Sequence, residues 1–251
     1  MAARTKQSNS ARQAKLARIT DDMVKELSSL SFNPPVEFVY NPMEYARDAF
    51  NAYAACCDLD SVEFILLGMN PGPWGMAQTG VPFGEVGAVR DWLKIDAAIG
   101  APIDEHPKRP VLGLDCHRSE VSGARLWGWA KDTFKTPKRF LKRFFLCNYC
   151  PLIFLEDSGR NRTPDKLPVV ERTPLLEICD RALQRTVELI SPKMVIGVGA
   201  FAQKRAENVL KDSAFSVGGI LHPSPASPIA NRGWAAQANK QFAEQGIRLP
   251  K

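Results

Sequence analysis

The chain has 251 residues, a net charge of +6 at pH 7 and 45% hydrophobic residues. Its length suits one domain, or barely two, with enough apolar material for a packed core. No apolar run approaches the roughly 20 residues of a membrane span, so we expect no membrane partner. The basic charge suits a polyanionic partner such as nucleic acid, but many basic proteins bind none.

Residues 1–20 carry five basic side chains and no acidic one. Three interpretations are open for this segment: a flexible basic tail, an arm that contacts DNA, or an organelle-targeting peptide. We expect a flexible tail, followed by a single domain over residues 21–251.

Helices and strands alternate along the rest of the chain. Capping residues, prolines and apolar periodicity predict helices over 21–30, 41–57, 85–98, 119–134, 173–190, 199–210 and 233–245. Short apolar runs predict buried strands over 62–67, 144–148, 194–198 and 215–221. Residues 100–113 and 156–172 are expected to be irregular. Strand–helix–strand units favour an α/β fold, a three-layer α/β/α sandwich around a short, mainly parallel four-stranded sheet.

A Gly- and Pro-rich stretch follows the first predicted strand directly. It begins with Gly68-Met69-Asn70-Pro71-Gly72-Pro73 and ends with Val81-Pro82-Phe83-Gly84-Glu85. Such a sequence forbids both a helix and a strand, so the chain leaves the strand in a fixed turn. Ligands of parallel sheets bind beyond the carboxyl ends of strands, where this turn lies. Taken alone, Asn70 is more often a structural turn residue than a functional one.

Three more stretches favour a functional role for Asn70. Leu221-His222-Pro223-Ser224-Pro225 closes the last predicted strand, and Asn148-Tyr149-Cys150-Pro151-Leu152 closes the second. With Gly68 to Glu85, and Ser119 to Arg125, they resemble the motifs of the single-strand-selective monofunctional uracil-DNA glycosylases. This family belongs to the uracil-DNA glycosylase superfamily, and the resemblance extends from about Tyr40 to Phe242.

The resemblance implies a DNA repair enzyme of base excision repair. It would flip uracil, and 5-hydroxymethyluracil as well, out of single- or double-stranded DNA and hydrolyse the N-glycosidic bond, leaving an abasic site. It implies catalytic roles for Asn70, which would position the attacking water, and for His222, which would donate to the base O2. A neutral amide accepts protons poorly, so we expect a dissociative mechanism. We expect the enzyme to act as a monomer.

The same resemblance assigns the base pocket. Asn148 would read the N3–H and O4 of uracil, Phe83 would stack on the base, and Met69 would line the pocket. Gly72 would leave room for a substituent on C5. For a lone Phe or His, core packing is the more common role.

A loop beyond His222 is expected to face the DNA and to fill the gap left by the flipped base. Its candidate contacts are Ser224, Pro225, Ala226, Ser227 and Arg232. Several relatives carry a bulky basic residue where this chain has Ala226, so a preference for single-stranded or mismatched uracil follows. Arg232 could reach a phosphate.

Two other functions remain open on the residues. A nucleotide-binding α/β enzyme could use Gly68 to Gly75 as a phosphate cradle, although neither Gly-x-Gly-x-x-Gly nor a Lys-Ser/Thr loop is present. A non-catalytic DNA-binding module would keep the fold and lose the chemistry.

The spacing of the cysteines does not indicate a metal site. Cys147-x-x-Cys150 has no second pair with ligand spacing, because Cys56 and Cys57 are adjacent. We expect reduced structural cysteines, no metal, no cofactor, and an intracellular protein: nuclear if eukaryotic, cytoplasmic if bacterial. The full set is Cys56, Cys57, Cys116, Cys147, Cys150 and Cys179.

Overall fold

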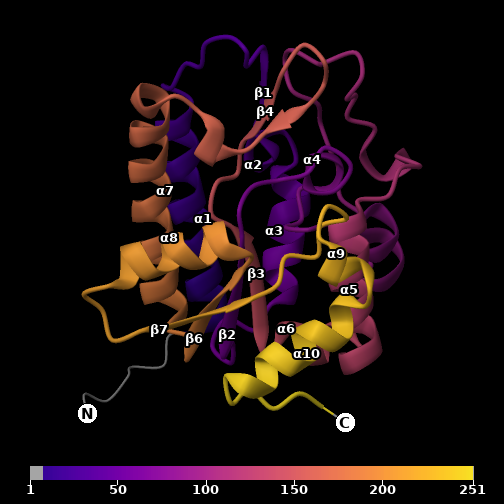
Figure 1. Cartoon of the computed structure of the whole chain (residues 1–251), viewed down its shortest axis with the longest axis vertical. Helices are drawn as coiled ribbons and strands as arrows, with labels where there is room; N and C mark the ends of the chain where they lie inside the picture. Colours follow the sequence, from indigo (N-terminus) through magenta and orange to yellow (C-terminus); the bar gives the residue numbers. More distant parts are fainter. Residues whose placement is uncertain (1–7, 251) are drawn as a thin grey trace.

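The computed structural model describes residues 8–250 of the chain, and its centre is a parallel sheet of four strands (Figure 1). The strands run in the order β3-β2-β6-β7, and each pair is parallel. Their bounds are β2 Phe64–Gly68, β3 Phe144–Asn148, β6 Met194–Val198 and β7 Ser216–Ile220. The predicted sheet is therefore confirmed, and all four carboxyl ends lie along one edge.

A second, smaller sheet was not predicted. Three short strands pair antiparallel in the order β1-β4-β5, with bounds β1 Phe38–Tyr40, β4 Ile153–Leu155 and β5 Asn161–Arg162. It lies beyond the carboxyl ends of the central strands (Figure 1). The predicted irregular segment over 156–172 thus contains one strand and a 3-10 turn, Pro164–Lys166.

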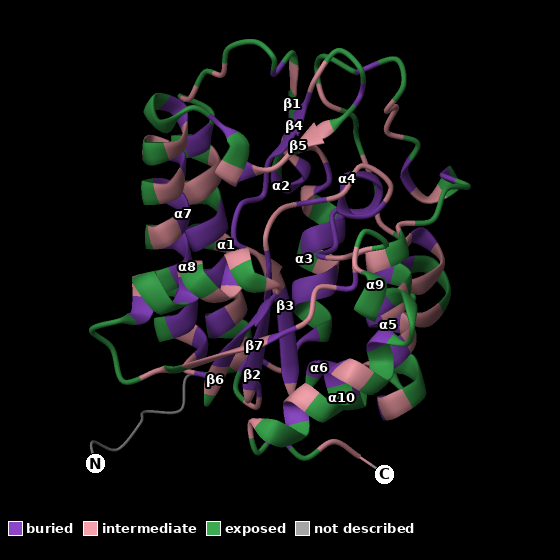
Figure 2. Cartoon of the chain, viewed as in Figure 1, coloured by how far each residue is buried: buried purple, intermediate pink, exposed green. Residues whose placement is uncertain are grey.

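Helices lie on both sides of the central sheet (Figure 1), and β2 and β3 between them are largely buried (Figure 2). In Figure 1, α1 and α7 are on the left, and α5, α6 and α10 are on the right. Their bounds are α1 Asn9–Leu27, α2 Pro42–Tyr45, α3 Arg47–Cys56, α4 Met76–Thr79, α5 Val121–Phe134, α6 Pro137–Leu141, α7 Val169–Ile190, α8 Ala200–Leu210, α9 Pro228–Asn231 and α10 Trp234–Glu244.

Three predicted helices differ from the structure. The helix expected over 85–98 is reduced to a π-helical turn, Ala88–Trp92, because Lys94 adopts a left-handed φ of 58° that ends it. The helix expected over 41–57 starts as predicted, with the Asn41 side chain accepting from Met43 N, but it breaks into α2 and α3. The helix expected to open at Thr173 begins instead at Val169, and Pro174 lies inside it.

The amino-terminal tail is a further correction. Residues 9–20 form the first part of α1, which continues through the weak helix predicted over 21–30 and packs along α7. Leu16 is only 3% exposed, and buried Arg12 pairs with Asp60 and donates to the carbonyl of Leu189. The prediction of a flexible tail is therefore wrong for residues 9–20; residues 1–7 lie outside the described part.

The remaining core is aromatic. Trp127 and Trp129 on α5 are 1% and 3% exposed, so they pack rather than stack on bases. The Trp129 ring stacks on Phe242 of α10, with ring centroids 5.2 Å apart. All six cysteines have free thiols. Over residues 8–250, no helix combines the length and the apolar character that crossing a membrane requires.

Candidate active site

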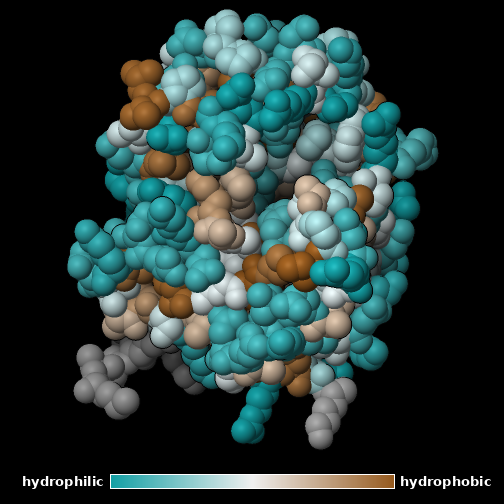
Figure 3. Space-filling view, viewed as in Figure 1, coloured by the Kyte–Doolittle hydropathy of each residue, from teal (hydrophilic) through white to brown (hydrophobic). Residues whose placement is uncertain are grey.

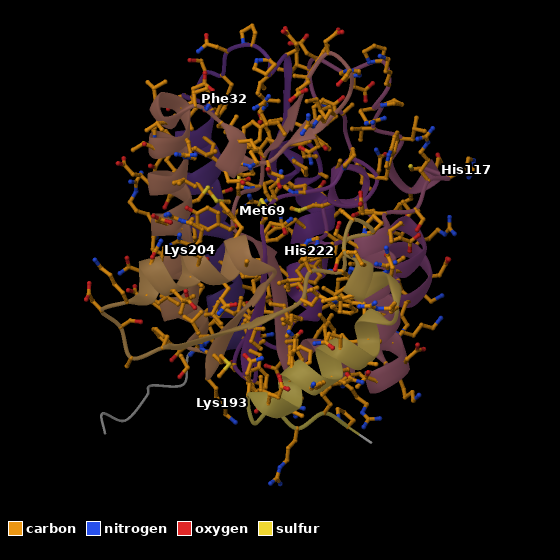
Figure 4. All side chains as sticks on the ribbon, in the orientation of Figure 1. Phe32, Met69, His117, Lys193, Lys204 and His222 are labelled. Carbon is orange, nitrogen blue, oxygen red and sulfur yellow. The ribbon has the colours of Figure 1, made fainter. Side chains whose placement is uncertain are left out.

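A pocket of about 150 Å³ opens where three strands of the central sheet end. Its walls come from the loop after β2, the last residue of β3, His222 beyond the end of β7, the start of α5 and the segment around β5. Figure 3 shows a recess in the middle of this face, and Figure 4 places Met69 and His222 in the same region. All six residues predicted for catalysis and base binding line it: Met69, Asn70, Gly72, Phe83, Asn148 and His222.

Asn70 is held by the segment that connects β3 to β4 of the smaller sheet. Its Nδ2 donates to the backbone carbonyl of Leu152 at 3.2 Å. This bond uses one end of the amide, so Oδ1 is the end left for a ligand or a water. Because a carboxamide oxygen only accepts, a water bound there would keep its own oxygen free to attack.

Asn148 ends β3 in register with Gly68 at the end of β2. Its Nδ2 lies 3.2 Å from the sulfur of Met76, a weak acceptor that helps to orient the amide. A Cβ on Gly68 would lie 2.2 Å from Asn148 Oδ1 and 2.7 Å from Phe83 Cζ. Only glycine at this position lets the amide and the ring approach each other. Met76 was not predicted, since an isolated methionine carries no such signal.

Phe83 has a left-handed backbone with φ of 54°, which is uncommon for a bulky residue. The turn around it is fixed by Thr79, whose hydroxyl lies 3.2 Å from the carbonyl of Gly84. Gly123 of α5 presses close, because a Cβ there would lie 2.2 Å from the Phe83 carbonyl oxygen. The surrounding structure therefore holds a strained conformation at the pocket wall, as is common at functional sites.

His222 faces the Phe83 ring, with centroids 6.4 Å apart and planes tilted by 41°. It is half-buried, and burial lowers the pKa of its imidazole below the ordinary value of 6.5. The segment is fastened on both sides: Trp234 Nε1 donates to the Leu221 carbonyl at 2.7 Å, and Arg125 Nη1 donates to the Pro223 carbonyl at 3.1 Å. The backbone on both sides of His222 is thus held in place, and the lowered pKa leaves the imidazole mainly neutral at pH 7.

Glu120 is a pocket residue that sequence reasoning missed. Its Oε2 accepts from the backbone N–H of Trp74 at 3.3 Å, and burial raises the pKa of the carboxyl. A Cβ on Gly72 would lie 2.3 Å from Oε2. The space that a side chain at Gly72 would take is therefore not free, as expected, but is occupied by the Glu120 carboxyl. Its position in the 119–125 motif was the available signal.

The predicted DNA-facing loop lies beside the pocket and does not line it. Pro225, Ala226 and Arg232 are exposed, while Ser224 and Ser227 serve the turn: Ser224 Oγ accepts from Ala226 N, and Ser227 Oγ accepts from Ala230 N. On the short helix α9 that follows, the side chain of Ile229 is exposed by 49%, an apolar group the sequence analysis did not single out.

No group of three or more His, Cys, Asp and Glu side chains within residues 8–250 is arranged to hold a metal ion. The functional groups that line the pocket are the amides of Asn70, Asn148 and Asn161, the hydroxyls of Ser122 and Thr163, the His222 imidazole, the Glu120 carboxyl and the Phe83 ring.

Comparison with known proteins identifies the family. The sequence model of the Uracil DNA glycosylase superfamily matches residues 56–244. The rat single-strand selective monofunctional uracil-DNA glycosylase is 50% identical over 224 residues, which cover 88% of this chain and 81% of that protein. The chain belongs to this family.

Two further matches agree. The bovine single-strand selective monofunctional uracil DNA glycosylase is 49% identical over 224 residues, covering 88% of this chain and 82% of that one. The crystal structure of Pedobacter heparinus SMUG2 superposes with a TM-score of 0.63 at 17% identity, covering 91% of this chain and 97% of that one. At that identity the likeness supports the shared fold alone.

Proposed function

We propose that this chain excises uracil from DNA by hydrolysing its N-glycosidic bond and leaves an abasic site with the strand intact. Membership in the family makes it a monofunctional DNA repair hydrolase that acts on N-glycosyl bonds. One observation carries the assignment to this pocket: Asn70, Phe83, Asn148 and His222, from three separate segments, meet around one cavity.

Asn148 recognises the base. Uracil presents an N3–H donor beside an O4 acceptor, and one carboxamide answers both. Oδ1 would accept from N3–H while Nδ2 donates to O4, and the Met76 sulfur beside Nδ2 favours that orientation. The Phe83 ring, close to the same amide, would stack on the base. Such stacking is worth about 1–3 kcal/mol per base in related settings.

His222 assists departure of the base. As the glycosidic bond breaks, negative charge develops on the base, and a donor aimed at O2 stabilises it. A neutral imidazole still carries one N–H, so the lowered pKa suits this role. A well-placed donor of this kind contributes about 2.7–4 kcal/mol, a hundred- to a thousandfold in rate.

Asn70 holds the attacking water. Its amide is too weak a base to deprotonate water early, so the sugar becomes cationic before the water adds. This dissociative order follows from the residue type alone, and the bond to Leu152 fixes the amide that binds the water.

The range of bases is set beside Gly72. With O2 at His222 and O4 at Asn148, the next edge of the ring, C5, faces Gly72 and Glu120. We infer that 5-hydroxymethyluracil is accepted, because a glycine leaves the C5 side free of an aromatic wall and the carboxyl of Glu120 can accept from a hydroxyl there.

Incubation with a single-stranded oligonucleotide carrying one uracil, in EDTA, tests the proposal. Alkali treatment should then cut the strand at that site, and free uracil should be released without cleavage before alkali. An intact strand after alkali would leave a non-catalytic DNA-binding module or a nucleotide enzyme. Cleavage without alkali would contradict monofunctional action.

A further inference from the structure

An open groove of about 620 Å³ lies beside the active-site pocket. We name it the Trp74 groove, after its central residue; its other defining side chains are Lys108, Arg109, His117 and Arg118. Its charged lining is cationic, because no Asp or Glu is among its lining residues in the described part. In Figure 4, His117 projects at the right margin, to one side of Met69 and His222.

Two guanidinium groups lie over the Trp74 indole. The Cζ atoms of Arg109 and Arg118 are 5.2 and 4.5 Å from the ring centroid, within the range of cation–π attraction. Within residues 8–250, neither forms an ion pair with a carboxylate. The stacked arginines therefore keep donors free for an external anion.

Arg109 supplies the more specific observation. Its Nη1 donates to the Lys108 carbonyl at 2.9 Å, but its Nε is buried and has no hydrogen-bond partner in the described part of the chain. A buried donor left unpaired is costly, so such a group indicates a missing acceptor. A phosphate oxygen is an acceptor that arginine binds well, often with two nitrogens at once.

The groove is joined to the active site. Trp74 lies four residues beyond Asn70 on the same loop, and its backbone N–H donates to Glu120, which lines the pocket. A strand with its target base in the pocket would therefore pass the groove close to that nucleotide.

We propose that the Trp74 groove binds the phosphodiester backbone of the target strand next to the flipped nucleotide. This rests on the proposed function of the pocket. The groove is assigned to phosphates, not to a stacked base, because guanidinium groups already lie over the indole. Stacking on Trp74 orders Arg109 and Arg118 before DNA arrives, and so lowers the entropy lost on binding.

Equilibrium binding to a single-stranded oligonucleotide is the first test. The probe carries one 2′-fluoro-2′-deoxyuridine, which resists excision. Arg118→Gln and Arg109→Gln should each raise Kd about tenfold, as expected for a hydrogen bond to a charged group. Each should also reduce the slope of log binding constant against log salt concentration by about 0.7, the contribution of one phosphate on a single strand.

Arg139→Gln is the matched control. Arg139 is exposed on α6, which precedes β3 and so lies at the opposite end of the strands from the pocket. It should leave both Kd and the salt slope unchanged. Equal losses in Arg118→Gln and Arg139→Gln would overturn the proposal, because overall charge would then explain the binding.

A scan of neutral methylphosphonate linkages locates the contact. With wild-type protein, one or two linkages on one side of the target should weaken binding, and in Arg118→Gln the same linkages should have no further effect. If these linkages weakened binding equally in the wild type and in Arg118→Gln, the proposal would be contradicted.

These binding measurements do not depend on excision. If the excision assay failed while this binding pattern was observed, only the proposed function would be refuted. Normal excision with unaltered binding in both groove variants would refute the groove alone.

Discussion

His222 is half-buried at the pocket, and burial keeps its pKa below 6.5. In the unfolded chain the imidazole takes up a proton near pH 6.5, whereas in the folded chain it does so only at lower pH. It therefore contributes stability above pH 6.5, and this contribution is lost as the pH falls through the folded pKa.

The excision rate should follow the neutral imidazole. Single-turnover excision of uracil should stay level from pH 8 down to 7, since the pKa of His222 lies below 6.5 and the imidazole stays mainly neutral over that range. The pH profile of the wild type, measured with a fixed oligonucleotide and salt, provides the check. A rate that climbs steadily from pH 8 to 6.5 would mean that the imidazolium is the donor.

Gly72 and Glu120 together define the C5 side of the pocket. Gly72→Tyr should depress excision of 5-hydroxymethyluracil far more than excision of uracil, because the ring would occupy the space next to C5. Single-turnover rates on both bases give the ratio. The new side chain must also displace the Glu120 carboxyl, which a Cβ alone would approach to 2.3 Å.

Glu120→Ala is the control for that displacement. It removes the carboxyl without filling the space, so it separates loss of the Glu120 contact from steric exclusion. If each of the two variants lowers excision of uracil and of 5-hydroxymethyluracil by the same factor, Gly72 supports the loop and does not select the base.

At the scale of elements, the loop after His222 is rigid but small. Arg125 fastens its start to Pro223 and its end through Asn231, with Nη2 to Oδ1 at 2.8 Å. The exposed residue at its tip, Ala226, offers little surface to replace a base in a stack.

The enzyme should therefore prefer uracil in single strands or in U:G mismatches over U:A pairs, where unstacking and unpairing cost a few kcal/mol. Ala226→Arg should improve U:A selectively. Single-turnover rates on the three substrates at one salt concentration test both statements. Equal rates on U:A and single strands by the wild type would contradict them. The exposed Ile229 on α9 would then be the next residue to test as the group that fills the gap in the stack.

Helix α1 is a structural element and not a tail. Leu16→Ala should lower the free energy of unfolding by about 2–5 kcal/mol, as for other large-to-small changes in a core. Uracil excision by the folded variant should be retained. Denaturant melts compare it with Arg18→Ala, which changes an exposed residue on the same helix and should have little effect. Identical melts for both variants would mean that α1 does not pack as described.

For the whole molecule, the central sheet was predictable because β2, β3 and β6 are largely buried on both faces. Ile65 and Leu66 are fully buried, and such runs read as uninterrupted apolar segments. The second sheet was missed because its strands have two or three residues. The first part of helix α1 was missed because Leu16 and Ile19 are scattered among basic residues, and the two are buried where the helix packs against α7.

The site residues were predictable from motifs, and their supports were not. Asn70, Asn148 and His222 stand at strand ends, which the order of apolar runs already indicated. Glu120 and Met76 lie inside two of these motifs, but nothing in a single glutamate or methionine predicts a contact with Gly72 or Asn148. Whether 21–251 alone forms the catalytic domain stays a prediction.

The most direct test of the central claim is single-turnover excision of uracil from a single-stranded oligonucleotide by Asn70→Ala and His222→Ala. Each should lose a hundredfold or more in rate, by the order of magnitude of one such contact, while thermal unfolding and DNA affinity stay close to the wild type. His106→Ala is the matched control, because this buried histidine bonds the Asp157 carbonyl at 2.9 Å outside the pocket. It should lose stability and keep its rate. The account would be contradicted if Asn70→Ala and His222→Ala lost stability and activity together, as a structural residue does, or if both excised uracil at the wild-type rate.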